Sequence, residues 1–218
     1  MKQLFTLLTT SIAIIFLTAS TTKNKEVAKI RSRFDEIQAN LQNKSYFVKN
    51  LSEKDTAENI IAYQKDGKTD MIMSEVGGAA GRLRYEYYYD KNDQLVFVLQ
   101  QFYKYNRPMY YDEATAIANN DDEYFDPEKT KILENRFYYS NQKLIQWINP
   151  QNEIVSLRNV DFQSKGKNFV GRSLNLVARL TEMPKNNDEI ISKHQQSSNA
   201  PQFARGEPAQ RRAGSTRL

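Results

Sequence analysis

The sequence predicts an α+β fold, in which an antiparallel β-meander is covered by an N-terminal amphipathic helix and by a C-terminal helix. Three observations support this prediction: helical apolar spacing over residues 26–42, repeated hairpin patterns over residues 60–157, and a second helical stripe over residues 167–183. The length of the chain fits one domain with additional terminal segments. We therefore expect a single domain.

The expected domain covers residues 21–184 of the 218-residue chain and lies between two segments of different composition. Residues 1–20 have the pattern of a signal peptide, and residues 185–218 form a basic, low-complexity tail that we expect to be disordered. The tail is rich in Gln, Ser, Asn, Ala, Pro, Gly and Arg, and this composition buries too little apolar surface to order a segment.

The N-terminal helix is predicted from apolar residues that are three or four positions apart. They are Val27, Ile30, Phe34, Ile37 and Leu41. The opposite face is charged, so we expect the helix to cover a sheet with its apolar side. A helix that seeks a partner chain is the alternative, but two heptads are too few for a coiled coil.

Turn residues between strand-like runs predict three hairpins. Asp66-Gly67 separates the runs 60–64 and 69–74, and Asp-Gly is a strong signal for a two-residue hairpin turn. The other predicted strands are 82–89 with 94–105, 135–139 with 143–148, and a short run over 153–157. Hairpins in succession predict an antiparallel meander.

Two segments repeat one plan. Residues 87–98 and 137–148 each contain an aromatic triplet, a polar turn, a leucine and then alternating apolar residues. This is a degenerate internal repeat of a hairpin, and its irregular spacing argues against a regular solenoid. Residues 106–130 separate the copies and contain a possible short helix at 112–119. Because long loops in compact domains are often functional, we expect any site here or on the adjacent sheet face.

The C-terminal helix is predicted from Phe169, Val170, Leu174, Val177 and Leu180. Gly171 weakens this pattern, and a strand over 174–177 is the alternative.

The first twenty residues predict export. Lys2 precedes an apolar stretch from Leu4 to Leu17, and Thr18-Ala19-Ser20 offers small residues for cleavage near residues 19–20. A membrane anchor is the alternative, but a spanning helix needs about 20 predominantly apolar residues, and this stretch is shorter. We expect a periplasmic or secreted protein whose mature chain has no membrane span.

Composition excludes several kinds of chemistry. The chain has no cysteine, so it contains no disulfide, thiol nucleophile or thiolate metal site. The one histidine, His194, lies in the tail, so the folded part lacks a Ser-His-Asp triad and a histidine zinc site. Lys2 supplies one unit of the +5 net charge and residues 185–218 supply three, leaving +1 for residues 21–184. We expect no nucleic-acid partner, no metal and no cofactor.

An acidic cluster in the 106–130 segment is a candidate cation site. Its members are Asp121, Asp122, Glu123 and Asp126. Calcium prefers several oxygen ligands, but this spacing does not match the helix-loop-helix calcium motif. A solvated acidic turn is the favoured interpretation.

Tyrosines at period-2 spacing form a candidate ligand platform. They are Tyr85, Tyr87, Tyr89, Tyr103 and Tyr105, with Glu86 and Tyr88 on the other face. Tyrosine rings stack against sugars, peptides or bases. The alternative is that cross-strand aromatic pairs only stabilise the sheet, and this is the favoured interpretation.

Two short motifs complete the candidates. The glycines of residues 77–81 lack the Gly-Lys-Ser/Thr of a phosphate loop and are expected to form a bulge or a tight turn. Asp55-Thr56-Ala57 resembles the short O-glycosylation motif of exported Bacteroidota proteins, with Thr56 as the acceptor.

A wider resemblance rests on residues 105–113, 124–129 and 134–139, which contain Tyr-Asn-Arg-Pro-Met-Tyr-Tyr, Tyr-Phe-Asp-Pro-Glu-Lys and Glu-Asn-Arg-Phe-Tyr-Tyr. Over about residues 26–157 the chain resembles uncharacterised exported, hairpin-rich proteins of Bacteroidota. The resemblance implies a leader and a short helix before hairpins, and no activity, catalytic residue or cofactor.

The leading functional hypothesis is an exported, non-enzymatic β-sheet protein that binds a ligand or associates with the cell envelope. The candidate partners are a glycan, a peptide or an envelope component. A carboxylate-dependent enzyme acting on glycans, with its site in residues 106–130, is the alternative. A pocket that holds several carboxylates of this segment near the tyrosines would favour the enzyme. A third hypothesis is adhesion through the basic tail.

Overall fold

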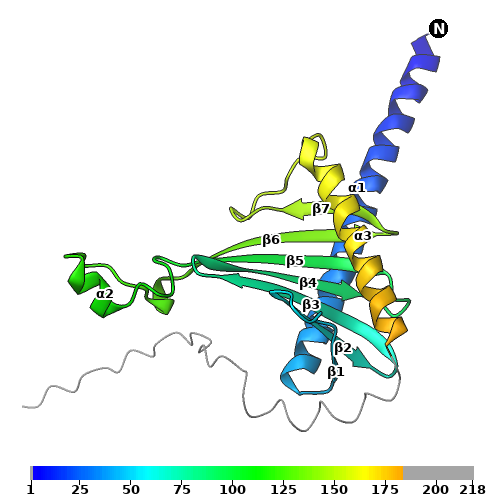
Figure 1. Cartoon of the computed structure of the whole chain (residues 1–218). Coiled ribbons are helices and arrows are strands. Elements are labelled where there is room, and N and C mark those ends of the chain that lie inside the picture. The colour runs from blue at the N-terminus through cyan, green and yellow to red at the C-terminus, as the bar shows by residue number, and fades with distance from the viewer. Residues whose placement is uncertain (1, 184–218) are drawn as a thin grey trace, which may run out of the picture.

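Seven strands form one antiparallel sheet, and their order in space follows their order in sequence (Figure 1). The computed structural model describes residues 2–183, with side chains from residue 22 onward. The strands are β1 (Phe47–Asn50), β2 (Glu58–Lys65), β3 (Lys68–Gly78), β4 (Gly81–Tyr89), β5 (Leu95–Lys104), β6 (Lys131–Ser140) and β7 (Lys143–Ile148). The predicted antiparallel meander is confirmed. The predicted tail at residues 185–218 lies outside the described residues.

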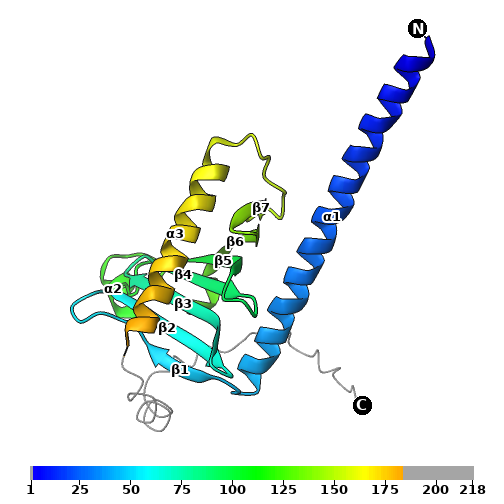
Figure 2. The ribbon, with the colours of Figure 1, turned by 90° about the vertical axis from the view of Figure 1, so that its right-hand side faces the viewer.

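Two long helices cover the two faces of the sheet (Figure 2). Helix α1 (Lys2–Gln42) packs on one face, and its N-terminal part continues beyond the sheet. Helix α3 (Val160–Glu182) packs on the other face. The side chains of the predicted signal peptide lie outside the described ones. Where side chains are described, no helix is long and apolar enough to cross a membrane.

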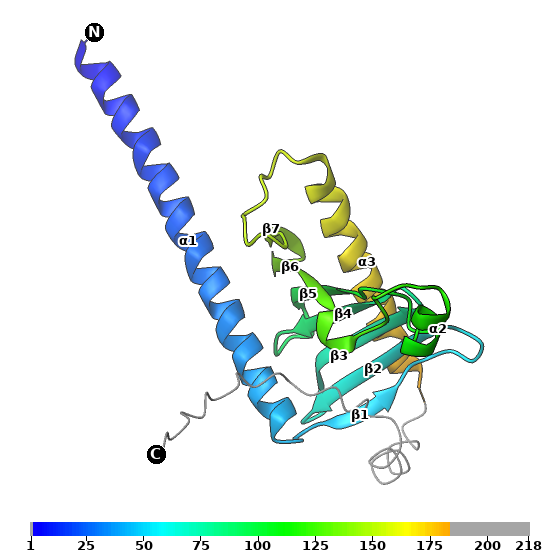
Figure 3. The same cartoon turned by 90° about the vertical axis from the view of Figure 1, so that its left-hand side faces the viewer.

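The segment between β5 and β6 contains only short helices, namely α2 (Glu113–Ala118) and the 3-10 turn η1 (Pro127–Lys129). Asp112 caps α2, because its side chain accepts a hydrogen bond from the Thr115 N–H. The short helix expected over residues 112–119 is thus present. In Figure 3 this segment lies at the end of the sheet that α1 does not cover.

The sequence missed or misplaced four elements. Helix α1 begins at Lys2 rather than at Glu26. Strand β1 at the sheet edge was not expected, and the run over 153–157 forms only an isolated bridge between Ile148 and Ile154. Helix α3 begins at Val160 rather than at Lys167, because Asn159 accepts a hydrogen bond from the Asp161 N–H and caps it early. The alternative strand over 174–177 is wrong, since these residues are helical.

The predicted turns are confirmed. Asp66 and Gly67, between β2 and β3, have φ values of 51° and 74°, and two positive φ angles are typical of a type I′ hairpin turn. The glycine-rich stretch is the turn from β3 to β4. Gly81 in this turn leaves no room for a side chain, because a Cβ there would lie 2.4 Å from the Tyr103 carbonyl oxygen.

Each face of the sheet has its own core. On the α3 face, Leu176 and Leu180 pack with buried strand residues that include Ile72, Val98 and Phe137. On the α1 face, the buried residues are Val27, Ile30, Ile37, Met71, Met73, Tyr88, Phe97, Leu99, Tyr138 and Ile148. The two cores hold the sheet between the helices without any disulfide.

The internal repeat has a structural counterpart. The β4–β5 pairing shifts register between Tyr88 and Tyr89, and the β6–β7 pairing shifts between Tyr138 and Tyr139. In both triplets the middle ring belongs to the α1-face core and the outer rings to the α3-face core. Each aromatic triplet therefore contributes to both cores, which explains why both copies are aromatic throughout.

Candidate binding groove

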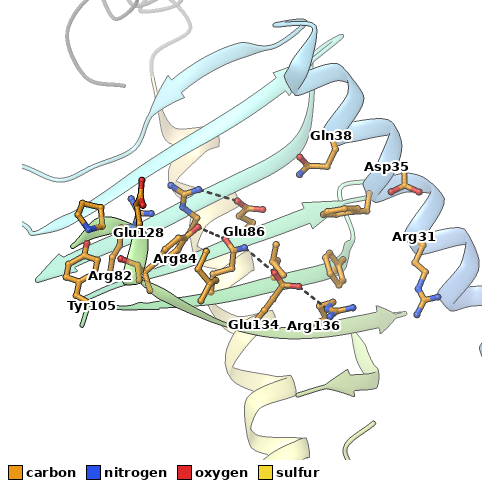
Figure 4. Close-up of a pocket in the computed structure, with 18 of the residues that line it drawn as sticks. Arg31, Asp35, Gln38, Arg82, Arg84, Glu86, Tyr105, Glu128, Glu134 and Arg136 are labelled. Carbon is orange, nitrogen blue, oxygen red and sulfur yellow. Dashed lines mark hydrogen bonds and ion pairs between the residues drawn. The ribbon is translucent and has the colours of Figure 1, made fainter. Parts of the chain in front are cut away.

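A groove of about 1540 Å³ lies on the α1 face, where the sheet continues beyond the helix (Figure 4). One wall is α1, which contributes Arg31, Asp35 and Gln38. The opposite wall is the segment after β5, which contributes Tyr105 and Glu128 at the far end of the groove. Strands β4, β5 and β6 form the floor.

Strand register arranges the floor in rows that cross the sheet. The row under α1 is aromatic and contains Tyr88, Phe97 and Tyr138. Phe34 of α1 packs on it, with ring centroids 5.1 Å from Tyr88 and 5.4 Å from Phe97. This row closes the floor at the helix end of the groove.

The next rows outward carry charge. Glu86, Leu99 and Arg136 form one row, followed by a row of Glu75, Arg84, Gln101 and Glu134, and then by an outer row of Arg82, Tyr103 and Ile132. From the aromatic row to the outer row is six residues along β5, or about 20 Å at the strand rise. The floor is therefore long enough for a ligand of several units.

The central polar row is held by contacts among its own members. The Arg84 Nε lies 2.7 Å from Glu75 Oε2, and Gln101 donates to Glu134 Oε2 at 3.2 Å. At its outer side, the Tyr103 hydroxyl donates to Gln101 Oε1 at 3.0 Å. Glu134 also lies 3.0 Å from the Arg136 Nε. These contacts fix the polar groups before a ligand arrives.

Glu86 is a largely enclosed carboxylate of the groove, and its side chain is 13% exposed. Burial raises the pKa of Glu86, although the hydrogen bond from Tyr88 and the charge of Arg84 oppose this shift. The Glu86 carboxylate accepts the Tyr88 hydroxyl at 2.5 Å, and Arg84 Nη1 lies 3.9 Å away. Glu86 therefore lies at the junction of the charged row and the buried core.

Aromatic rings define the end of the groove far from α1. The Arg82 guanidinium carbon lies 4.0 Å from the Tyr103 ring centroid, a cation–π geometry. Tyr105 packs edge-to-face on Phe125 at 5.2 Å between centroids. Asn106 fixes this wall, since its side chain donates to the Tyr124 carbonyl at 2.8 Å and accepts the Asp126 N–H at 3.0 Å.

The five candidate tyrosines do not share one face of the sheet. Tyr103 pairs with Arg82 and lies on the groove side, and Tyr105 also lines the groove. Tyr85, Tyr87 and Tyr89 belong to the α3 side. Period-2 spacing places residues on one face within a strand, but the register between β4 and β5 decides which residues of the two strands share that face.

The three tyrosines of β4 are structural in character. Tyr87 is 2% exposed and Tyr89 is fully buried, and burial raises the pKa of both hydroxyls. Tyr89 accepts a hydrogen bond from Ser173 at 3.1 Å, which ties it to α3. Tyr85 packs beside Phe169 of α3, with centroids 5.8 Å apart.

The four residues of the acidic cluster do not form one site, because two of them are held apart by local contacts. Asp121 lies 2.7 Å from the Arg107 Nη2, and a backbone hydrogen bond from Glu123 lowers the pKa of Asp121. Asp126 caps η1, and Asp122 is exposed. Among the described residues, no three His, Cys, Asp or Glu side chains are grouped to hold a metal ion. Of this cluster only Asp126 lines the groove.

Thr56, the candidate glycosylation acceptor, lies exposed in the loop between β1 and β2, and its hydroxyl donates to the Glu53 carbonyl at 3.1 Å. Its modification stays a prediction. Sequence reasoning missed the charged residues of the floor, which are Arg82, Arg84, Glu86, Glu134 and Arg136. The signal was present, because Arg-x-Arg-x-Glu in β4 and Glu-x-Arg in β6 place charge on every second residue.

Comparison with known proteins gives no relative: no family model, curated protein or solved structure matches the chain. The resemblance to exported proteins of Bacteroidota stays a prediction. The groove and its chemistry therefore carry the functional argument.

Proposed function

We propose that this protein is an exported, non-enzymatic binding module, and that the groove beside α1 is its ligand site. The observation that carries this proposal is the set of contacts that hold Arg84, Gln101 and Glu134 in one row across the floor. Polar groups held in place before binding lose little conformational freedom when a ligand arrives, which favours recognition.

The state of the groove carboxylates favours binding over hydrolysis. Glycoside hydrolysis by two carboxyl groups needs one proton donor and one carboxylate free to attack or to activate water. Glu134 already contacts Gln101 and Arg136, and Asp126 caps η1. Glu86 is suited to be the proton donor because its pKa is raised. However, Glu75 and Glu134, the carboxylates whose charges act on Glu86, are already paired with Arg84 and Arg136.

Residues 112–126 contain six carboxylates that an enzyme could use, and only one of them, Asp126, lines the groove. The others are Asp112, Glu113, Asp121, Asp122 and Glu123. Asp112 instead caps α2. Glu128 is the other carboxylate of residues 106–130 in the groove, so the six carboxylates on which the enzyme hypothesis rested are not brought together there.

Export is part of the proposal and rests on the leader pattern. Residues 21–184, the domain that would be exported, have a near-neutral charge and no cysteine. The domain therefore needs no disulfide-forming enzyme to fold. The described α1 residues in the sheet core begin at Val27, seven positions after Ser20. Cleavage near residue 20 is therefore compatible with the packing of the helix.

The binding site is tested by blocking the groove without touching the core. Ile132 lines the groove and is 53% exposed, and Leu133 beside it is 40% exposed and lies on the α3 side. Ile132→Arg is the blocking variant and Leu133→Arg is its matched control. Both positions are solvent-accessible, so we expect both variants to fold.

The readout is chemical-shift perturbation of the ¹⁵N-labelled domain with polysaccharide, peptide and lipid fractions of a bacterial envelope. We expect one fraction to shift resonances of the groove, with the shifts lost in Ile132→Arg and kept in Leu133→Arg. Shifts centred outside the groove, or equal effects of both variants, contradict the proposal.

A further inference from the structure

We infer that the ligand of the groove is an uncharged oligosaccharide. This inference rests on the proposed function, and it adds the chemical class of the ligand. Three features of the groove lead to it: balanced charge, a row of planar polar side chains, and aromatic rings at one end.

Charge in the groove is nearly balanced, and the charged residues of its central rows are paired with one another. Four arginines and five carboxylates line it. Arg84 is paired with Glu75 and Glu86, and Arg136 is paired with Glu134. A polyanion would need unpaired cations, and a polycation would need free carboxylates. The groove therefore suits a ligand with many hydrogen-bonding groups and no net charge.

The central row matches the hydrogen-bonding pattern of sugar hydroxyls. Arg84, Gln101 and Glu134 lie on adjacent strands, about 4.8 Å apart along the row. A guanidinium offers several N–H donors, an amide offers both a donor and an acceptor, and a carboxylate offers two acceptor oxygens. Neighbouring hydroxyls of a sugar ring both donate and accept, so one ring can engage two such side chains.

The outer end of the groove offers a stacking surface. Pyranose rings have an apolar face of C–H groups, and an aromatic ring is its natural partner. Tyr103 is anchored there by Arg82 and by its hydrogen bond to Gln101, and Tyr105 with Phe125 stands beside it. A ligand that lies along the floor therefore meets polar groups in the middle and rings at the end.

A peptide fits this floor less well. Extended peptides usually bind sheets by pairing with an exposed edge strand. Strand β5, in the middle of the floor, pairs with β4 on one side and with β6 on the other. The backbone N–H and C=O groups of a peptide bound on this floor could therefore hydrogen-bond only to side chains of the protein, and not to a free strand edge. The apolar row that could hold a peptide anchor is covered by Phe34.

Three neighbouring residues of β5 supply the test. Gln101 and Tyr103 line the groove, whereas Phe102 between them lies on the α3 side and is 39% exposed. We would measure binding by titration calorimetry with cellotetraose, chitotetraose and maltotetraose. Tetragalacturonate and a decapeptide mixture serve as the charged and peptide probes.

We expect at least one uncharged tetrasaccharide to bind, with affinity reduced tenfold or more in Gln101→Ala and Tyr103→Ala and unchanged in Phe102→Ala. Thermal melts of the three variants check that the fold is kept. Binding of the peptide or the acidic sugar alone, weakened by Gln101→Ala, overturns the ligand class and leaves the groove as the site.

No response of any binding to the groove variants overturns both this inference and the proposed function. If the wild-type protein releases reducing ends from a tetrasaccharide and Glu86→Gln does not, the protein is an enzyme that hydrolyses the sugar in the groove. This result overturns the non-enzymatic assignment. An uncharged tetrasaccharide that binds equally well to all three variants, while another probe loses affinity in Gln101→Ala, places the sugar elsewhere and overturns this inference alone.

Discussion

The hydroxyl of Tyr88 donates a hydrogen bond to Glu86, two residues earlier on the same face of β4, with 2.5 Å between the oxygens. The same hydroxyl accepts a hydrogen bond from Gln38 of α1 at 2.7 Å. Tyr88 is fully buried, so this phenol connects the wall of the groove to its floor. The protonation state of Glu86 therefore affects both the sheet and the helix that packs on it.

The first prediction concerns this carboxyl group. Burial raises the pKa of Glu86 in the folded protein above its value in the unfolded chain, so the folded state holds its proton to higher pH. Stability then falls as pH rises from the unfolded pKa through the folded pKa, by up to 1.36 kcal/mol for each unit of difference. Glu86→Gln removes this loss, so we expect the variant to gain stability relative to wild type between pH 4 and pH 7.

Urea unfolding at a series of pH values measures this difference. Glu128→Gln is the control, because Glu128 is an exposed residue of the same groove. A stability difference between Glu86→Gln and wild type that does not change with pH would contradict the prediction.

The second prediction concerns the turn that positions Tyr103. A Cβ on Gly81 would lie 2.4 Å from the Tyr103 carbonyl oxygen, whereas a Cβ on Gly77 would meet nothing within 4 Å. We expect Gly81→Ala to lower the free energy of unfolding by about 2 kcal/mol, because backbone must move. Gly77→Ala should change it by less than about 0.5 kcal/mol. Thermal or urea unfolding checks both, and equal effects would show that the turn tolerates a side chain.

The architecture could be predicted because most of its elements follow from short-range patterns in the sequence. Three patterns depend only on neighbours in sequence: the stripe from Val27 to Leu41, the Asp66-Gly67 turn and the two aromatic triplets. The helix, the turn and the hairpins that these patterns predict are present. Strand β1 has only four residues and lacks a turn signal of its own, which is why it was missed. Its place at the edge depends on pairing with β2, a tertiary contact.

The groove could not be predicted in the same way. Arg82 faces Tyr103, and not Tyr85, because of the register between β4 and β5, and a shift of one residue would reverse the arrangement. The extent of α1 over the sheet is equally non-local, and it decides that Phe97 is covered while Gln101 is accessible. The chemistry of the floor was visible as alternating charge, but its position between two walls was not.

The third prediction concerns an ion pair that fastens α3 to the sheet. The Arg172 Nη2 lies 2.5 and 2.6 Å from the two carboxylate oxygens of Glu58 in β2, and Ser74 donates to Glu58 Oε1 at 2.5 Å. Partial burial would raise the pKa of Glu58, but hydrogen bonds from Ser74 and Arg172 outweigh it, so the pKa is lowered. The pair therefore stabilises the fold above the unfolded pKa of the carboxyl and loses its effect as pH falls through the folded pKa.

A double-mutant cycle of Glu58→Gln and Arg172→Met measures this coupling. We expect about 1 kcal/mol at pH 7, decreasing toward zero in acid. The exposed pair Lys68–Asp93, with 3.3 Å between Nζ and Oδ2, serves as the reference and should give less than about 0.5 kcal/mol. A coupling for Glu58–Arg172 no larger than that of the reference pair would contradict the prediction.

The last prediction concerns the leader. When the full chain is expressed in a bacterium with a general secretion pathway, we expect the protein in the periplasm or medium to begin near residue 20 or 21. Intact-mass measurement of the fractionated protein locates the new terminus. Ile14→Arg, which places a charge in the apolar stretch, should remain unprocessed inside the cell. Full-length protein in the membrane fraction would show an anchor instead. A chain that starts at Thr21 should unfold at the temperature of the exported form, because the described core contacts of α1 begin at Val27.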